Sequence, residues 1–246
     1  MISYENISNA TLKIECGSHS GTGFFFIKPE IVITNYHVLE QGLKDQNTIR
    51  AISKYYIIEK LEILAFSPVD INDYAILKLP NDFSIKSLPL VPRYESSITL
   101  GNEIIFSGFP HGISDLLIQR AIISGFVDDH KFYIDGSVNG GNSGGPIIDL
   151  SDGKVIGIIT QRRFFGSQEL EKLKQESEQL ENYCKAISKN MKFEIMGIDF
   201  AGYIALISKA MKLIGNAITL NANTGIGIGY SIKFLEEDCR KLGIIT

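Results

Sequence analysis

The sequence has few cysteines, with only Cys16, Cys184 and Cys239 among its 246 residues. They lie far apart and fit no metal-ligand spacing, so free thiols are predicted rather than a disulfide framework or a zinc site. The first residues show no basic segment followed by an apolar one, which is the pattern of a secretory signal. Together these features predict a reducing compartment, and we expect a cytoplasmic protein.

Long uncharged apolar runs and blocks of like charge are also missing. The most apolar stretch, Ile195–Leu220, contains Asp199, Lys209 and Lys212, whereas a transmembrane helix needs about 20 nearly uncharged residues. A buried or amphipathic helix is therefore predicted there. The net charge of −4 argues against a nucleic acid or an anionic membrane as the main partner, and we expect neither.

Short segments rich in Ile, Val and Phe recur between residues 10 and 160, and Gly, Pro, Asn and Asp separate them. This spacing is typical of an all-β sandwich or barrel. The hydrophobic share of 44% is sufficient for a sizeable core. The predicted strands are Thr11–Cys16, Thr22–Ile27, Ile31–Thr34, Asp73–Leu79, Glu103–Phe109, Ile118–Ile123, Lys131–Ile134 and Val155–Thr160.

The pattern changes after these strands. From Ser167 to Met191 apolar residues recur every three or four positions, which predicts a helix with a narrow apolar stripe. Asp199 would cap a second helix that runs to about Ala217. A strand over Gly225–Ile232 and a short helix over Phe234–Leu242 follow. The stripe consists of Leu170, Leu173, Leu180, Cys184, Ile187 and Met191.

The segment Asn139–Pro146 surrounds Ser143 with glycine. Glycines let the backbone turn so that two N–H groups converge on one point. In an acyl-transfer enzyme the amides of Gly141 and Ser143 would hold the developing oxyanion, although a turn with a chance serine explains the bare pattern equally well. In α/β-hydrolases the histidine follows the serine, and this order is excluded because every histidine precedes Ser143. The histidines are His19, His37, His111 and His130.

The order His, Asp, Ser remains available for a catalytic triad. His37 ends an apolar strand, and Asp73 begins another. A carboxylate at such a position needs a partner, which a histidine N–H supplies. Asp70 is a second, less favoured candidate for the acid. The remaining histidines are predicted to lie in loops or surface turns, with His19 and His111 in segments that approach the cleft.

On its motifs the sequence resembles the trypsin-like serine peptidases, in particular the bacterial high-temperature-requirement type. The resemblance covers roughly residues 10–162 and 224–242. The matching segments are Gly21–Phe26, Thr34–Val38, Asn72–Leu77, Gly108–Pro110, Gly141–Pro146, Val155–Ile158 and Gly225–Gly229.

The resemblance implies an all-β fold of two perpendicular six-stranded barrels, roughly residues 8–95 and 96–235, in one peptidase domain over residues 1–246. Residues 164–223 would form a helical insertion in the second barrel, and a C-terminal helix would close the fold. The triad of His37, Asp73 and Ser143 would lie in the cleft between the barrels.

The resemblance also implies the chemistry. Ser143 would attack the peptide carbonyl, His37 would act as base and then acid, and Asp73 would orient the imidazole. A protein or peptide substrate is expected, and no metal or organic cofactor is required.

The specificity pocket is predicted around Ser137, Ile158, Ile159 and Thr160. Trypsin has an Asp at the position of Ser137, so the neutral serine favours a non-basic residue at the cleavage site, although the nearby Asp135 leaves this open.

Asn142 is a departure from enzymes activated by cleavage at the N-terminus, in which an Asp at this position pairs with the new amine. Such activation is therefore not expected here.

An alternative function is a catalytically silent binding or chaperone module on a protease scaffold. The insertion is either decoration or a lid or docking element, in which case residues 167–220 would bind a regulatory protein.

Overall fold

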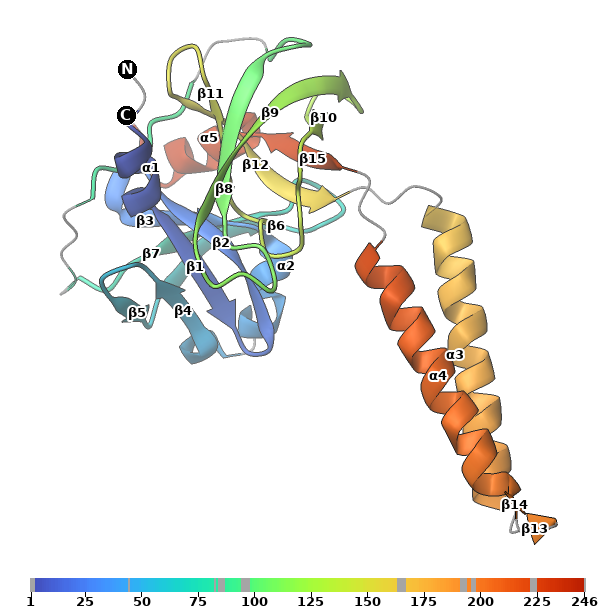
Figure 1. The fold of residues 1–246 in the computed structure, drawn as a ribbon. Coiled ribbons are helices and arrows are strands. Elements are labelled where there is room, and N and C mark those ends of the chain that lie inside the picture. Colours follow the sequence, from blue (N-terminus) through green and yellow to red (C-terminus); the bar gives the residue numbers. More distant parts are fainter. Residues whose placement is uncertain are drawn as a thin grey trace. The chain divides into compact units, whose positions relative to one another are not determined.

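A computed structural model describes residues 3–43, 45–81, 83, 87–93, 98–162, 167–190, 194–195, 198–221 and 225–245. The chain divides into two compact units (Figure 1). Met1–Arg162 and Gly225–Thr246 form the first unit, and Arg163–Thr224 forms the second. Within the described ranges no helix has the length and apolarity needed to cross a membrane.

The first half of the β unit is a seven-stranded antiparallel sheet in the order β5-β4-β1-β2-β3-β7-β6. A short helix, α1 (Tyr4–Ala10), precedes it, and α2 (Tyr36–Leu39) with two 3₁₀ turns, Glu40–Leu43 and Gln46–Thr48, follows the third strand. The first barrel is expected to have six strands, whereas this sheet has seven. The strands are β1 (Thr11–Cys16), β2 (His19–Phe26), β3 (Lys28–Thr34), β4 (Ile49–Ile52), β5 (Ile57–Glu59), β6 (Glu62–Ser67) and β7 (Tyr74–Lys78).

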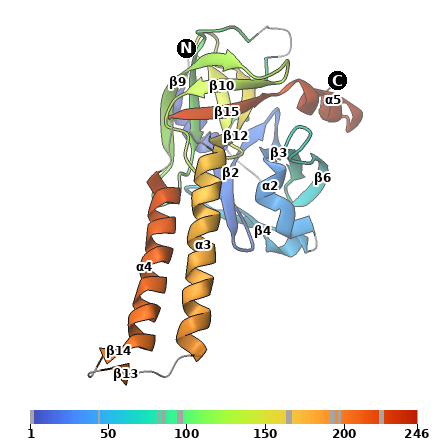
Figure 2. The same ribbon diagram turned by 90° about the vertical axis from the view of Figure 1, so that its right-hand side faces the viewer.

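The second half is a closed six-stranded barrel in the order β10-β15-β12-β11-β8-β9 (Figure 2). It confirms the expected chymotrypsin-type barrel. Here β12 and β15, far apart in sequence, are neighbours that pair from Gly157–Ser231 to Arg162–Gly227. The strands are β8 (Glu103–Gly108), β9 (Leu117–Phe126), β10 (Lys131–Asp135), β11 (Pro146–Asp149), β12 (Val155–Arg162) and β15 (Ile226–Ser231).

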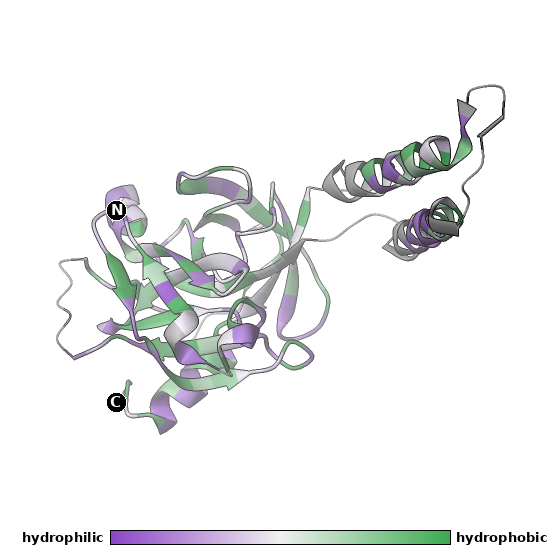
Figure 3. Cartoon of the chain, turned by 90° about the horizontal axis from the view of Figure 1, so that it is seen from below, coloured by the Kyte–Doolittle hydropathy of each residue, from purple (hydrophilic) through white to green (hydrophobic). Residues whose placement is uncertain are grey.

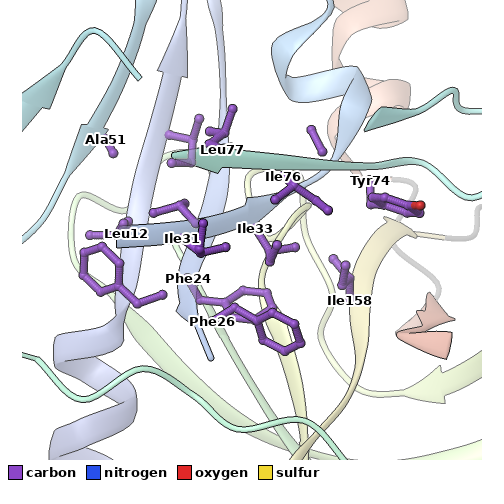
Figure 4. Packing of buried hydrophobic residues seen from close by; sticks show 14 of the residues in the cluster. Leu12, Phe24, Phe26, Ile31, Ile33, Ala51, Tyr74, Ile76, Leu77 and Ile158 are labelled. Carbon is purple, nitrogen blue, oxygen red and sulfur yellow. The ribbon is translucent and has the colours of Figure 1, made fainter. Parts of the chain in front are cut away.

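The two halves share one hydrophobic core. The aromatic residues Phe24 and Phe26 of β2 are fully buried and pack edge to face, 5.7 Å between ring centroids. Ile158 of the barrel belongs to the same cluster and points toward the side chains of the first sheet (Figure 4). A second cluster fills the barrel itself. The shared core fixes the first sheet against the barrel, and it thereby fixes any site built from both.

The C-terminal helix α5 (Lys233–Lys241) returns from the barrel to the first sheet. Leu235 and Cys239 are buried in the shared core. The Tyr74 hydroxyl donates a hydrogen bond of 2.6 Å to Asp238, and burial together with this neighbour raises the pKa of Tyr74. Burial also raises the pKa of the Cys239 thiol to about 12. Cys16 is buried as well, so the prediction of buried free thiols is confirmed for both.

The second unit is an antiparallel pair of helices, α3 (Ser167–Asn190) and α4 (Phe200–Asn221), with the small strands β13 (Glu194–Ile195) and β14 (Ile198–Asp199) between them. Both helices agree closely with the sequence prediction. Leu180, a member of the predicted apolar stripe, is 51% exposed. Leu170, Leu173 and Met191 lie outside the part of the chain whose side chains are described.

A charged network ties the segment between the two halves to the barrel. Arg93 donates 3.0 Å to Asp149 and 2.8 Å to Asp152. Asn102 donates 2.7 Å to the same Asp149 oxygen. Burial alone would raise the pKa of Asp149, but hydrogen bonds from Ser151 and from Arg93 outweigh it and hold this pKa below its usual value.

Asp149 is nearly fully buried, at 2% exposure, so removing its cation should destabilise the fold. We expect Arg93→Ala to lower the free energy of unfolding by about 3 kcal/mol, because breaking a buried ion pair leaves an unpaired charge. Because the folded-state pKa of Asp149 is depressed, its stabilising contribution is present at neutral pH and is lost below about pH 4. Urea unfolding at pH 7 and pH 3 measures both effects. An equal loss from Arg93→Ala at the two pH values would contradict the assignment.

Candidate active site

His37 enters the site from α2, directly after β3 ends. Its side chain is 33% exposed, and its Nδ1 lies 2.8 Å from Oδ2 of Asp73. A carboxylate on Nδ1 holds the proton on that nitrogen and leaves Nε2 as the basic atom. The imidazole is therefore oriented with one edge on the acid and the other available to a substrate or a nucleophile.

Asp73 is completely buried at the end of a turn in which its N–H donates to the Pro68 carbonyl. Its φ of +47° is a left-handed conformation that Asp tolerates better than most residues. The carboxylate accepts hydrogen bonds from the His37 backbone N–H at 3.1 Å, from the His37 ring and from the Thr160 hydroxyl. Asn35 donates to the Asp73 carbonyl at 2.5 Å. These bonds fix the carboxylate against His37.

The alternative acid, Asp70, is exposed in the same turn, and no contact with His37 is found among the described residues. The buried position that a histidine N–H can satisfy thus belongs to Asp73. This agrees with the sequence prediction, which favoured Asp73 because it begins the apolar strand.

Ser143 lies in the loop between β10 and β11. Its Oγ donates 3.0 Å to the Thr160 carbonyl; within the described ranges no hydrogen bond joins it to His37. Thr160 thus bridges the site, because its hydroxyl binds Asp73 and its carbonyl accepts from Ser143. It occupies a bulge in β12, where the pairing with β15 shifts register after Ile159.

The loop around Ser143 is held by its carbonyl groups. The Gly140 carbonyl accepts from the His111 N–H at 2.7 Å, and the Asn142 carbonyl accepts from the Gly145 N–H at 2.9 Å. In a planar trans peptide the following N–H points the opposite way, so the amides of Gly141 and Ser143 are turned away from these bonds. Neither has an acceptor in the described part of the chain. Two such donors are what an oxyanion hole requires.

Gly141 is required by this geometry. Its φ is +92°, and a Cβ built on it would lie 2.2 Å from the Phe109 carbonyl oxygen. The fully buried Thr22 of β2 adds two bonds to the loop, from its hydroxyl to the Gly141 carbonyl and from its N–H to the Ser143 carbonyl, both 2.7 Å. The first sheet therefore shapes the loop that carries Ser143.

Asn142 is buried, and its side-chain oxygen accepts a 2.9 Å hydrogen bond from the Asn139 N–H. Its own N–H donates to the Asn139 carbonyl at 3.1 Å. The side chain therefore stabilises the turn locally, and no amine of the described residues is bonded to it.

The residues predicted to form a specificity pocket differ in the exposure and the contacts of their side chains. Ser137 is exposed. The side chains of Ile158 and Ile159 are buried in the two hydrophobic clusters, and the Thr160 hydroxyl is bound to Asp73. Any contact of these three β12 residues with a substrate must therefore come from their backbone. No sequence pattern predicts the bridging role of Thr160 or the contacts of Thr22.

The other histidines lie outside the His37–Asp73 pair. His19 lies on β2 with its Nε2 3.3 Å from the Gln41 side chain. The His111 ring lies close to Gly140 and Gly141, and among the described residues no hydrogen bond joins it to Ser143 or His37. His130 packs on Phe234 at the opposite end of β10. Among the described residues no group of three or more His, Cys, Asp and Glu side chains is arranged to hold a metal ion.

Comparison with known proteins gives several proteases among the relatives. The chain is 32% identical over 149 residues to a probable periplasmic serine endoprotease DegP-like of Chlamydia muridarum, covering 57% of this chain and 28% of that protein. It is 31% identical over 160 residues to the serine protease HTRA4 of Mus musculus, covering 59% and 30%. The chain therefore spans less than a third of the length of these two relatives.

Solved structures of proteases also match this chain. The inactive form of the Rv3671c protease matches with a TM-score of 0.53 and 25% identity, over 64% of this chain and 80% of that one. Deg5 matches with a TM-score of 0.54 and 25% identity, over 64% and 81%. The family described as "Trypsin-like peptidase domain" matches residues 21–158, more than half of the sequence. The chain therefore belongs to the family of trypsin-like peptidase domains.

Proposed function

We propose that this chain is a serine endopeptidase that hydrolyses peptide bonds through an acyl-enzyme, with Ser143 as nucleophile, His37 as general base and acid, and Asp73 as the orienting acid. The observation that carries the proposal is the chain of hydrogen bonds from His37 through Asp73 and Thr160 to Ser143. Family membership supports it independently.

The reaction starts with a rotation of the Ser143 side chain from the Thr160 carbonyl toward Nε2 of His37. Oγ then bonds to the peptide carbonyl carbon while its proton moves to Nε2, and the carbonyl electrons form an oxyanion that the N–H groups of Gly141 and Ser143 stabilise. Collapse of this intermediate breaks the C–N bond, and His37 protonates the leaving amine. Water, deprotonated by His37, then hydrolyses the ester.

A serine-directed fluorophosphonate tests the nucleophile. Ser143→Ala should abolish covalent labelling and lower kcat on a peptide by about 10⁴-fold or more. The matched control is Ser124→Ala, at an exposed serine on β9, which should label and turn over like the wild type. Hydrolysis at the wild-type rate by Ser143→Ala would refute the proposal. An unlabelled, inactive wild-type chain would instead favour the silent binding or chaperone module.

The acid is tested by two matched substitutions. Asp73→Asn should lower kcat by roughly 10⁴-fold, because an amide cannot hold the imidazole in the same tautomer. Asp70→Asn should leave kcat within about twofold, since Asp70 is exposed and has no described contact with His37. Steady-state kinetics at pH 8 measure both variants. A large loss from Asp70→Asn with little from Asp73→Asn would reverse the assignment.

The substrate is proposed to be a protein or peptide, since the names of the relatives describe proteases. We keep the cytoplasm as the proposed location from the cysteine content, although the relatives include a probable periplasmic enzyme of Chlamydia muridarum and a chloroplastic one of Arabidopsis thaliana. Fractionation of cells that express the chain with its natural flanking sequence tests this proposal.

Regulation through the antiparallel helices α3 and α4, which we call the helical hairpin, is a further part of the proposal. The hairpin is joined covalently to β12 and β15, which pair directly with each other. Thr160, the residue that binds both Asp73 and Ser143, lies three residues before the hairpin unit begins at Arg163. A force on the hairpin that shifts the end of β12 would therefore move the group that orients both triad members.

Replacing Ser167–Leu220 with a short Gly/Ser linker tests this route. The variant should remain folded, and its peptidase kcat should change by tenfold or more, about 1.4 kcal/mol in the barrier. Labelling of Ser143 by a phosphonate serves as the control for an assembled site. A folded variant with wild-type kinetics on both peptides and proteins would show that the hairpin has no regulatory role.

A further inference from the structure

The helical hairpin exposes many large apolar side chains. A helix with apolar residues on several sides is normally buried among neighbours, and α4 has only two charged residues, Lys209 and Lys212, in 22 positions. Figure 3 shows hydrophobic residues among the hydrophilic ones of the hairpin. The exposed residues are Leu180 and Tyr183 of α3 and Tyr203, Leu206, Leu213 and Ile214 of α4, each between 49% and 68% exposed.

One side of each helix is used for the contact within the hairpin. Ser177 donates 2.8 Å to the Met211 carbonyl, and Ser208 donates 3.2 Å to the Glu181 carbonyl. A Cβ built on Gly215 would lie 3.1 Å from the Ser177 hydroxyl. These contacts define both the antiparallel register and the side of α4 that faces α3.

A second stripe on α4 is left uncovered by α3. Tyr203, Leu206, Ala210 and Leu213 follow one another at steps of three, four and three residues, the spacing of a coiled-coil seam. At 100° per residue, the centre of this stripe lies about 150° around α4 from the middle of the side that carries Ser208, Met211 and Gly215. Tyr203, Leu206 and Leu213 are 58%, 64% and 68% exposed. The seam has the pattern of a buried surface without a partner in the described residues.

The apolar residues of α3 extend the same face. Leu180 and Tyr183 lie about 100° around α3 from the side that carries Ser177. Each apolar stripe is rotated around its helix away from the side that contacts the other helix. Because the two helices are antiparallel, these two rotations bring both stripes toward the same side of the hairpin. The register of Glu181 with Ser208 brings Leu180 and Tyr183 level with the stretch between Leu206 and Ala210. The hairpin therefore presents one continuous apolar face from both helices.

We propose that this face, which we call the hairpin face, docks against the hairpin face of a second copy of the chain, so that two hairpins form a four-helix bundle. Such bundles bury coiled-coil-type stripes from each helix. The six exposed side chains offer roughly 100 Å² each, about 1,200 Å² for two copies, which reaches the size of a specific interface. This surface is independent of the peptidase chemistry.

The charges around the hairpin face favour a second copy over a lipid surface. Anionic membranes recruit helices whose polar side is rich in Lys and Arg. Five glutamates lie on α3 against four lysines, and α4 adds only two lysines. A mixed charge pattern beside apolar stripes is instead typical of the exposed positions of a helical bundle.

Sedimentation velocity of the full chain between 1 and 100 µM tests the proposal. The wild type should sediment with the mass of two chains at the upper concentrations. Leu206→Glu and Leu213→Glu should each weaken association at least 100-fold, because each would bury a charge in the seam. The matched control is Asn182→Glu, an exposed position on the side of α3 away from the hairpin face, which should associate like the wild type.

Circular dichroism checks that the glutamate variants keep their helices. If one unfolds, hydrogen exchange of the wild type decides the question, since amides around Leu206 should become more protected as concentration rises. A wild type that is monomeric at 100 µM, with exchange independent of concentration, would overturn the proposal. Dimers that persist in both folded glutamate variants would overturn it too, as would a monomer that binds neutral or anionic lipid vesicles.

Discussion

The interaction on which the site depends is the hydrogen bonding of one buried carboxylate. Asp73 has no exposed surface, so its charge is tolerated only because His37 and Thr160 donate to it. These donors come from the two halves of the fold: His37 follows a strand of the first sheet, and Thr160 lies in the barrel. Satisfying Asp73 therefore requires the two halves to be docked, and the same docking brings Ser143 to the Thr160 carbonyl.

The docking has two further supports. Ile158 of β12 packs in the core of the first sheet, two residues before Thr160, so burial of one side chain determines where the other lies. Thr22 of β2 holds two carbonyls of the Ser143 loop. Since the Gly140 and Asn142 carbonyls are also bonded, the loop leaves the amides of Gly141 and Ser143 without an acceptor among the described residues. Preorganised donors of this kind are the largest single contribution to many acyl transfers.

The hairpin differs from the β unit in how much of its apolar surface is buried. The β unit has two filled clusters of buried side chains, whereas α4 has a second seam that α3 does not cover. A pair of helices can bury only one stripe of each, so the remaining apolar surface favours association. The hairpin leaves the β unit at the end of β12, the strand that also carries Thr160.

The sequence by itself determined most of the local elements, and it predicted His37, Asp73 and Ser143 as the candidate site residues that the fold brings into one region. Apolar runs bounded by turn residues located most strands, and the steps of three and four located α3 and α4, because these periods reflect local backbone geometry. The sequence pattern does not predict β4, β5, β6, β11, β13 and β14. All but β6 have only two to four residues, Arg50 lies inside β4, and β6 begins with the charged Glu62. Tertiary structure alone decided that Thr160 bridges Asp73 and Ser143 and that Leu180 is left about half exposed. Both depend on contacts between segments distant in sequence, which no local pattern encodes.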